Sequence, residues 1–73
     1  MRWENEQKFV EIEHVSSVDV GPAIVVSSNA FEGPLPVEWR ETIPDTEPLR
    51  QEELIASVGM WAARNGFIEV RLD

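Results

Sequence analysis

The sequence predicts an α+β fold, in which one long helix packs on one face of a small, mainly antiparallel sheet of three to four strands. Three observations lead to this prediction. An apolar stripe at helical spacing runs through residues 46–65, segments on both sides of it alternate between apolar and polar residues, and a continuous apolar run occupies residues 24–26. In chain order these give β-β-β-α-β, an arrangement typical of the α+β class.

The helix is expected over residues 46–65, where most positions carry strong helix formers. Apolar residues recur at i, i+1, i+4, i+7 and i+8 and so form one face. They are Leu54, Ile55, Val58, Trp61 and Ala62. Gly59 costs roughly 1 kcal/mol in a helix interior. We expect it to allow the close approach of a neighbouring backbone or aromatic ring.

The two ends of this helix also have sequence signals. Asp45 or Thr46 is the expected N-terminal cap. Pro48 is tolerated in the first turn, because its missing N–H would have no helical partner there. Asn65-Gly66 predicts a left-handed C-terminal cap.

Two segments predict half-buried strands by their alternation. In residues 8–15, Val10 and Ile12 point inward and the glutamates between them point outward. In residues 67–72, Ile68, Val70 and Leu72 are expected to form the apolar face.

The run at residues 24–26 predicts a more deeply buried strand. A turn near Ser16-Ser17 is the preferred connection to it. One long strand over residues 8–20 that turns at Gly21-Pro22 is the alternative.

A further edge strand is expected after a turn at residues 31–34. Leu35, Val37, Trp39 and Ile43 share one parity, with only Glu41 breaking the apolar face. The proline at position 36 confines such a strand to an edge of the sheet or to a strand's first residues. An exposed edge can pair with another chain.

The composition bounds the class of protein. Residues 1–73 form a single small domain, and the polar start at Met1 without an apolar leader favours a complete soluble protein. There is no cysteine, which fits a reducing, cytoplasmic setting, and no apolar run approaches the length of a membrane span. Fourteen acidic residues against six basic ones give a net charge of −8, which repels nucleic-acid phosphates and anionic lipid.

No constellation in the sequence predicts catalysis, a metal site or a cofactor. His14 is the single histidine, and alternation places it on the face opposite Glu11 and Glu13, so a surface histidine is favoured over a ligand. Ser16 and Ser17 lack the glycine-flanked turn of a nucleophile and are typical of a turn. A chain of this length also has little room for a catalytic cleft. We therefore expect a protein that is not an enzyme.

The charge is concentrated in residues 32–53, called the acidic segment below. It holds seven acidic residues against two arginines and so carries five of the eight net negative charges. The sequence alone leaves two interpretations, an ordinary solvated face and a docking surface. Trp39 likewise is either a cap on the core edge or a partly exposed anchor.

The functional hypothesis is a non-enzymatic interaction protein that binds a basic surface of a protein partner. The class considered is an inhibitor that occludes a nucleic-acid-binding site, of the antitoxin, immunity or phage counter-defence type. Such a function would make this chain a viral or prophage protein. The alternative is a small structural subunit that self-associates through an edge strand, for example as a homodimer. The residues expected to bind the partner are Glu38, Trp39, Arg40, Glu41, Asp45, Glu47, Glu52 and Glu53.

Overall fold

A computed structural model describes residues 1–71 and confirms the α+β class. The described elements, in chain order, are β1 (Arg2–Asn5), β2 (Lys8–Ser17), β3 (Gly21–Ser28), the 3₁₀ helix η1 (Val37–Trp39), β4 (Ile43–Pro44), α1 (Pro48–Arg64) and β5 (Ile68–Val70). The strands form one sheet in the order β4-β3-β2-β1-β5, and every neighbouring pair is antiparallel. The sheet therefore has five strands rather than the three to four expected.

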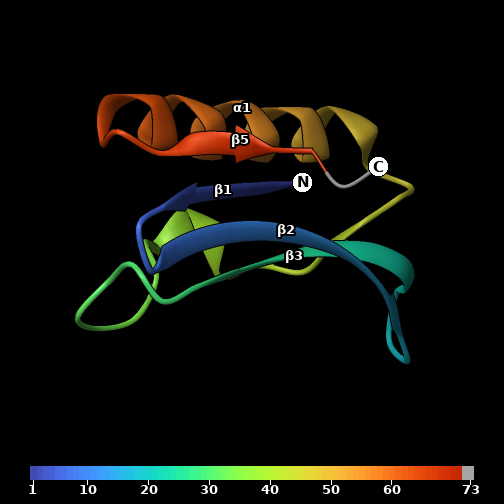
Figure 1. The fold of residues 1–73 in the computed structure, drawn as a ribbon. Helices are drawn as coiled ribbons and strands as arrows, with labels where there is room; N and C mark the ends of the chain where they lie inside the picture. Colours follow the sequence, from blue (N-terminus) through green and yellow to red (C-terminus); the bar gives the residue numbers. More distant parts are fainter. Residues whose placement is uncertain (72–73) are drawn as a thin grey trace.

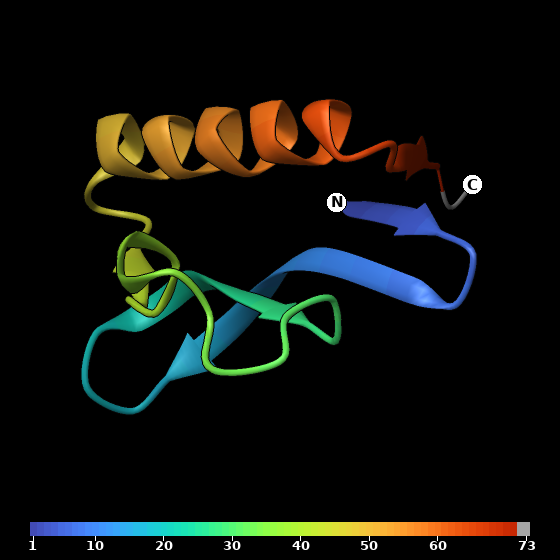
Figure 2. The same ribbon diagram turned by 90° about the vertical axis from the view of Figure 1, so that its left-hand side faces the viewer.

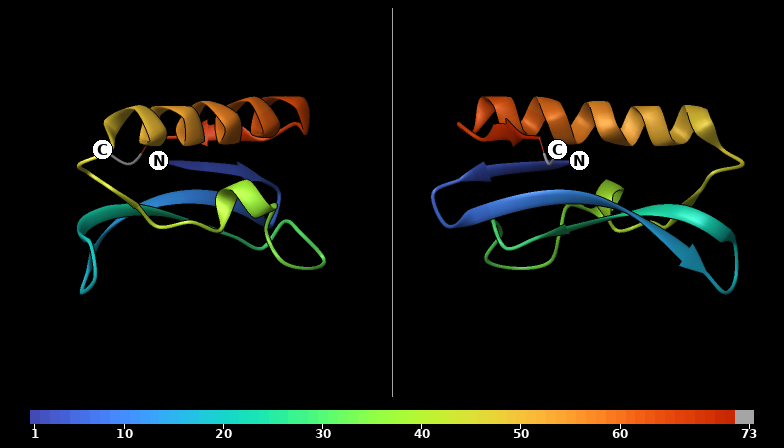
Figure 3. Two further views of the ribbon diagram at one scale, coloured as in Figure 1. Left: turned by 180° about the vertical axis from the view of Figure 1, so that it is seen from behind. Right: turned by 45° about the vertical axis from the view of Figure 1, so that its right-hand side comes forward.

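The layers are visible in Figure 1, where α1 lies along one side of the sheet, close to β1 and β5. The long hairpin of β2 and β3 curves away from the helix and ends in a projecting turn (Figure 3). In Figure 2 the connection between β3 and α1, which contains η1, faces the viewer. This connection and the helix together cover the apolar core.

The additional strand is β1, in a segment whose polar composition does not predict a strand. Trp3 pairs in register with Val10 of β2 and is only 6% exposed. The two strands are joined through Glu6, which takes the left-handed conformation with φ of 58°. The aromatic ring of Trp3 lies against Gly59 of α1, where an added Cβ would be 3.7 Å from the ring. Gly59 therefore does admit a neighbouring aromatic ring, as expected.

The helix starts two residues later than predicted, and its N-terminal cap differs. Glu47 occupies the capping position without a side-chain hydrogen bond, and Pro48 is the first helical residue. Asp45 does not cap the helix, because its carboxylate binds His14 and Gln51 instead. A proline at the first helical position removes one unpaired N–H group, which reduces the need for a side-chain cap.

The C-terminal end of α1 follows the prediction. Gly66 has φ of 76°, and the N–H groups of Gly66 and Phe67 donate to the carbonyls of Ala63 and Ala62, at 3.5 and 2.8 Å. This is a Schellman motif, and its usual apolar contact is present because Phe67 packs on Trp61 with ring centroids 5.1 Å apart.

This cap explains why the inward face of β5 was wrongly predicted. Phe67 is directed onto the core, and Ile68 is left 73% exposed. A shift of one residue exchanges the two faces of a strand. Leu72, expected on the apolar face, lies outside the described residues.

The turn between β2 and β3 follows Ser17 and precedes Gly21, so it lies between the two alternatives considered and starts close to the preferred one. The Ser17 hydroxyl accepts hydrogen bonds from the N–H groups of Asp19 and Val20, at 3.2 and 3.4 Å. Such a side-chain-to-backbone turn ends the strand locally.

The edge strand expected around residues 35–43 is wrong for most of its length. Residues 37–39 form η1 instead, and only Ile43 and Pro44 pair with β3. The buried apolar residues of the described chain are Trp3, Val10, Ile12, Ala23, Ile24, Val26, Trp39, Ile43, Leu54, Val58 and Ala62. Within residues 1–71 no helix is both long and apolar enough to cross a membrane.

Gly59→Ala should raise the free energy of unfolding by about 0.5–1 kcal/mol, because alanine is the better helix former and its Cβ meets Trp3 at an ordinary contact distance. Urea denaturation followed by circular dichroism measures the change. Gly66→Ala is the matched control and should lower stability by about 1–2 kcal/mol, since its φ is positive. A destabilised Gly59→Ala variant would contradict this account of the contact between α1 and Trp3.

Candidate functional site

Trp39 is a core residue, only 3% exposed, and this favours the interpretation that it closes the core edge. Its indole N–H donates to the Ser57 hydroxyl at 3.3 Å, which joins η1 to α1. Its ring stands edge-on to Phe31 and Trp61, with centroids 5.6 and 5.5 Å away. In this arrangement the neighbours of Trp39 cover almost all of its side chain, so it offers a partner very little contact area. It fixes the position of its neighbours in the chain.

Arg40 also has a structural partner, because its Nε donates to the Leu35 carbonyl at 2.6 Å. A second hydrogen bond, from the backbone N–H of Trp39 to the Pro36 carbonyl at 2.9 Å, joins this contact in closing the short turn around η1. The guanidinium therefore helps to hold the segment that carries Glu38 and Glu41.

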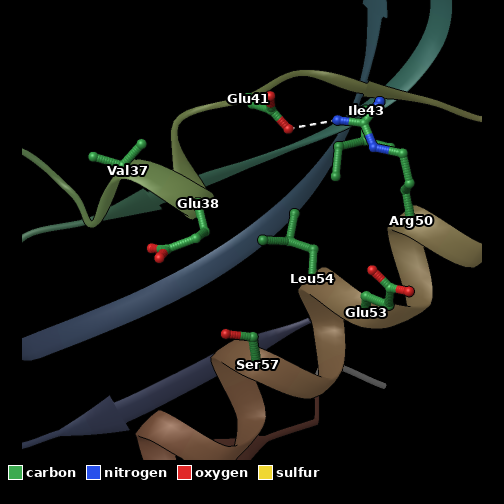
Figure 4. Close-up of a pocket in the computed structure, with 8 residues that line it drawn as sticks. All are labelled: Val37, Glu38, Glu41, Ile43, Arg50, Glu53, Leu54 and Ser57. Carbon is green, nitrogen blue, oxygen red and sulfur yellow. Dashed lines mark hydrogen bonds and ion pairs between the residues drawn. The ribbon is translucent and has the colours of Figure 1, made fainter.

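A cleft of about 450 Å³ lies between this segment and α1, and we call it the acidic cleft. It is lined by Val37, Glu38, Glu41, Ile43, Arg50, Glu53, Leu54 and Ser57. In Figure 4 Glu38 and Leu54 lie opposite each other: the side chain of Leu54 points toward Glu38, the carboxylate of Glu38 is turned away from Leu54, and Ser57 lies below them on the helix. Buried Ile43 and Leu54 supply an apolar floor, and three carboxylates surround it.

Arg50 closes one end of the acidic cleft. Its guanidinium donates to Glu41 across the cleft and to Glu47 at 2.8 Å (Figure 4 shows the first of these). The hydrogen bond and the negative charge of Glu47, followed by the charge of Glu41, raise the pKa of Arg50 above its already high ordinary value. Glu41 and Glu47 are thus partly neutralised, whereas within residues 1–71 neither Glu38 nor Glu53 forms an ion pair.

Asp45 lies away from the cleft, in a separate polar cluster. Its carboxylate accepts from Gln51 Nε2 at 2.8 Å and contacts His14 Nε2 at 2.9 Å. The Gln51 hydrogen bond, and after it the His14 contact, hold the pKa of Asp45 below its ordinary range. Gln51 also donates to the Ile43 carbonyl, so this cluster ties β2 and β4 to the first turns of α1.

The eight residues predicted to bind a partner are therefore not one contiguous surface. Glu38, Glu41 and Glu53 meet at the acidic cleft. Glu52 is one residue from Glu53, hence about 100° further around the helix, and does not line the cleft. The remaining four, namely Trp39, Arg40, Asp45 and Glu47, have the structural contacts described above.

A second depression, of about 320 Å³, adjoins the acidic cleft, and we call it the apolar depression. The two share Glu38 and Ser57, and the second is further lined by Pro36, Trp39, Met60, Trp61 and Arg64. Val37 in the first and Met60 in the second are 69% and 56% exposed, so both offer apolar contact area.

Sequence reasoning missed Met60, Ser57 and the role of Arg50. The i, i+3 spacing of Glu47 and Arg50 was the one available signal.

The other paired carboxylates, Glu11 and Glu13, lie in β2 and do not line either depression. A hydrogen bond between them lowers the pKa of Glu11 and raises that of Glu13. Arg2 joins the same network, with its Nη1 3.4 Å from Glu11, its Nε 2.6 Å from Glu4 and its guanidinium over the Phe9 ring. These contacts tie β1 to β2 on the sheet surface.

The described residues contain no group of three histidine, cysteine or carboxylate side chains placed to hold a metal ion. No family model, no curated protein and no solved structure matches this chain. Its function therefore has to be inferred from the chemistry of its surface. The two adjoining depressions combine exposed apolar side chains with two carboxylates, Glu38 and Glu53, that form no ion pair within residues 1–71.

Asp45→Asn should lower stability near neutral pH, because the carboxylate form accepts the bonds from Gln51 and His14. A group whose folded-state pKa is lowered contributes stability above its unfolded value, about 3.9 for aspartate, and loses it as the pH falls through the folded value. The difference between the wild type and Asp45→Asn should therefore shrink below about pH 4. Urea denaturation across pH 2.5–7 is the measurement. Glu52→Gln is the control, and an equally pH-dependent loss there would contradict the assignment.

Proposed function

We propose that this chain is a non-enzymatic interaction protein that binds a basic surface of a protein partner through the acidic cleft and the adjoining apolar depression. The single observation that carries the proposal is the position of Glu38 and Glu53. They lie on facing walls of a cleft with an apolar floor and have no ion-pair partner among residues 1–71. Two carboxylates so placed attract lysine or arginine side chains.

The apolar part of the interface is assigned to Val37 and Met60 in place of the buried Trp39. Both are exposed and line the joined depressions. Interfaces combine an apolar centre with a polar, charged rim, and methionine is enriched at them. Among the eight residues predicted from sequence, Glu38, Glu41 and Glu53 thus contact the partner. Trp39 and Arg40 hold the turn that carries Glu38, Glu47 holds Arg50, and Asp45 and Glu52 do not line the cleft.

The net charge of −8 supports the choice of a basic partner. Complementary charge accelerates association over distances of about a Debye length, roughly 8–10 Å at physiological salt, and disfavours acidic partners. Basic protein surfaces commonly bind nucleic acid, and the proposed action of this chain is to occlude such a site as an inhibitor. Antitoxin, immunity and phage counter-defence proteins form that class, and the absence of cysteine fits a cytoplasmic setting.

Glu38→Gln combined with Glu53→Gln should reduce capture of the partner about fivefold to tenfold at low salt, and much less at high salt. Each exposed charge contact contributes up to about 1 kcal/mol, and salt screens it. The measurement is a quantitative pull-down from the native host or its target cell at two salt concentrations.

Glu52→Gln combined with Glu69→Gln is the matched control, since it removes the same charge away from the cleft. It should leave capture nearly unchanged. Equal capture by the wild type and by the Glu38→Gln, Glu53→Gln variant would refute the proposal.

The second candidate is a structural subunit that self-associates through β5, and the exposure of Ile68 at this edge strand favours it. Backbone groups on an edge strand can pair with those of another copy. Sedimentation at high micromolar concentration should then show a dimer that Ile68→Lys abolishes. A wild-type monomer under these conditions would rule this candidate out.

A further inference from the structure

The acidic cleft and the apolar depression adjoin along the flank of α1, and their outer ends differ in charge. Glu38 and Ser57 line both of them and so lie where the two meet. The outer end of the acidic cleft carries Glu53 and the Glu41–Arg50 ion pair, and the outer end of the apolar depression carries Arg64. We call this combined surface the bipolar groove.

The helix builds the bipolar groove with one stripe of side chains. Glu53, Ser57, Met60 and Arg64 lie at i, i+4, i+7 and i+11, which returns to nearly the same face of an α-helix. The stripe is distinct from the buried face formed by Leu54, Val58 and Ala62. At about 1.5 Å per residue, Glu53 and Arg64 are about 16 Å apart along the axis.

Arg64 is a cation without an ion pair inside the described chain, unlike Arg2 and Arg50. It is exposed, and it follows Met60 at the end of the groove. A uniformly basic partner segment would place one of its own cations beside Arg64. Like charges brought together at an interface disfavour the complex, so Arg64 selects against such a segment.

We propose that the bipolar groove takes one short segment of the partner that carries a cation, an apolar side chain and an anion in that spatial order. This inference rests on the proposed function and specifies its partner. The cation binds Glu38 and Glu53, the apolar side chain packs on Val37 and Met60, and the carboxylate binds Arg64.

We assign an extended segment to the groove, because its side-chain spacing fits the length between Glu53 and Arg64. An extended chain rises about 3.3 Å per residue and directs every second side chain to one face. A Lys-x-Leu-x-Glu pattern therefore spans about 13 Å on one face, and the long lysine side chain covers the remainder.

The experiment uses three synthetic peptides with blocked ends, Lys-x-Leu-x-Glu, Lys-x-Leu-x-Gln and Lys-x-Leu-x-Lys, with x as serine. Their binding to the whole chain is measured by NMR titration up to millimolar concentration. The wild type should bind the glutamate peptide about threefold to fivefold more tightly than the lysine peptide, as expected for one exposed ion pair. Arg64→Glu should reverse this order, and Arg64→Gln should remove it.

Glu38→Gln combined with Glu53→Gln should weaken all three peptides without changing their order, because the cation is common to them. Circular dichroism verifies that each variant is folded. Failure of every peptide to bind, or equal binding of all three to the wild type and to Arg64→Glu, would refute the bipolar groove. In either case the proposed function would still be decided separately, by the salt-dependent capture of the native partner.

Discussion

The packing of four aromatic rings holds the long β3–β4 connection against helix α1. Phe31, Trp39, Trp61 and Phe67 form a chain of contacts with ring centroids 4.9–5.6 Å apart. Only Trp61 and Trp39 belong to helical elements, so the cluster joins the long β3–β4 connection and the turn after α1 to the helix itself. A buried aromatic side chain removes about 150–250 Å² from water, and here Trp39 is buried while the other three rings are half-buried. The chain of 73 residues has no cysteine, so no disulfide helps to hold the connection in place.

The groove depends on this cluster. Because Trp39 is held against Trp61 and donates to Ser57, its neighbour Glu38 is placed across from Glu53. The ion pair of Arg50 with Glu41 then connects the same two walls at the surface. The surface that we assign to partner binding is therefore positioned by core packing, which distinguishes it from a flexible acidic loop.

The sequence predicted those parts of the structure that local periodicity controls. Helix α1, strand β2 and the inward face with Val10 and Ile12 follow directly from alternation and helical spacing. Strand β1 was missed because its one apolar side chain, Trp3, is buried by long-range contact with α1.

Residues 35–39 were misassigned for a related reason. Alternating Leu35, Val37 and Trp39 suggest a strand, yet only Trp39 is buried, and it is buried by the aromatic cluster rather than by a sheet. The concentration of charge in the acidic segment was evident from sequence, whereas the separation of Asp45 and Glu52 from the cleft was not. That separation depends on the direction of each side chain in the folded chain.

The use of the basic residues explains why Arg64 can act in recognition. The chain has six, and three of them have internal roles: Arg2 binds Glu4 and Glu11, Arg40 binds a backbone carbonyl, and Arg50 binds Glu41 and Glu47. Within residues 1–71 the arginine ion pairs thus lie where they join elements of the fold, and Glu38 and Glu53 are among the carboxylates left without an ion pair. In such a negative field a cation attracts anions only at short range. Arg64 can therefore distinguish a carboxylate that is already docked beside it, while long-range attraction of the partner depends on the acidic residues.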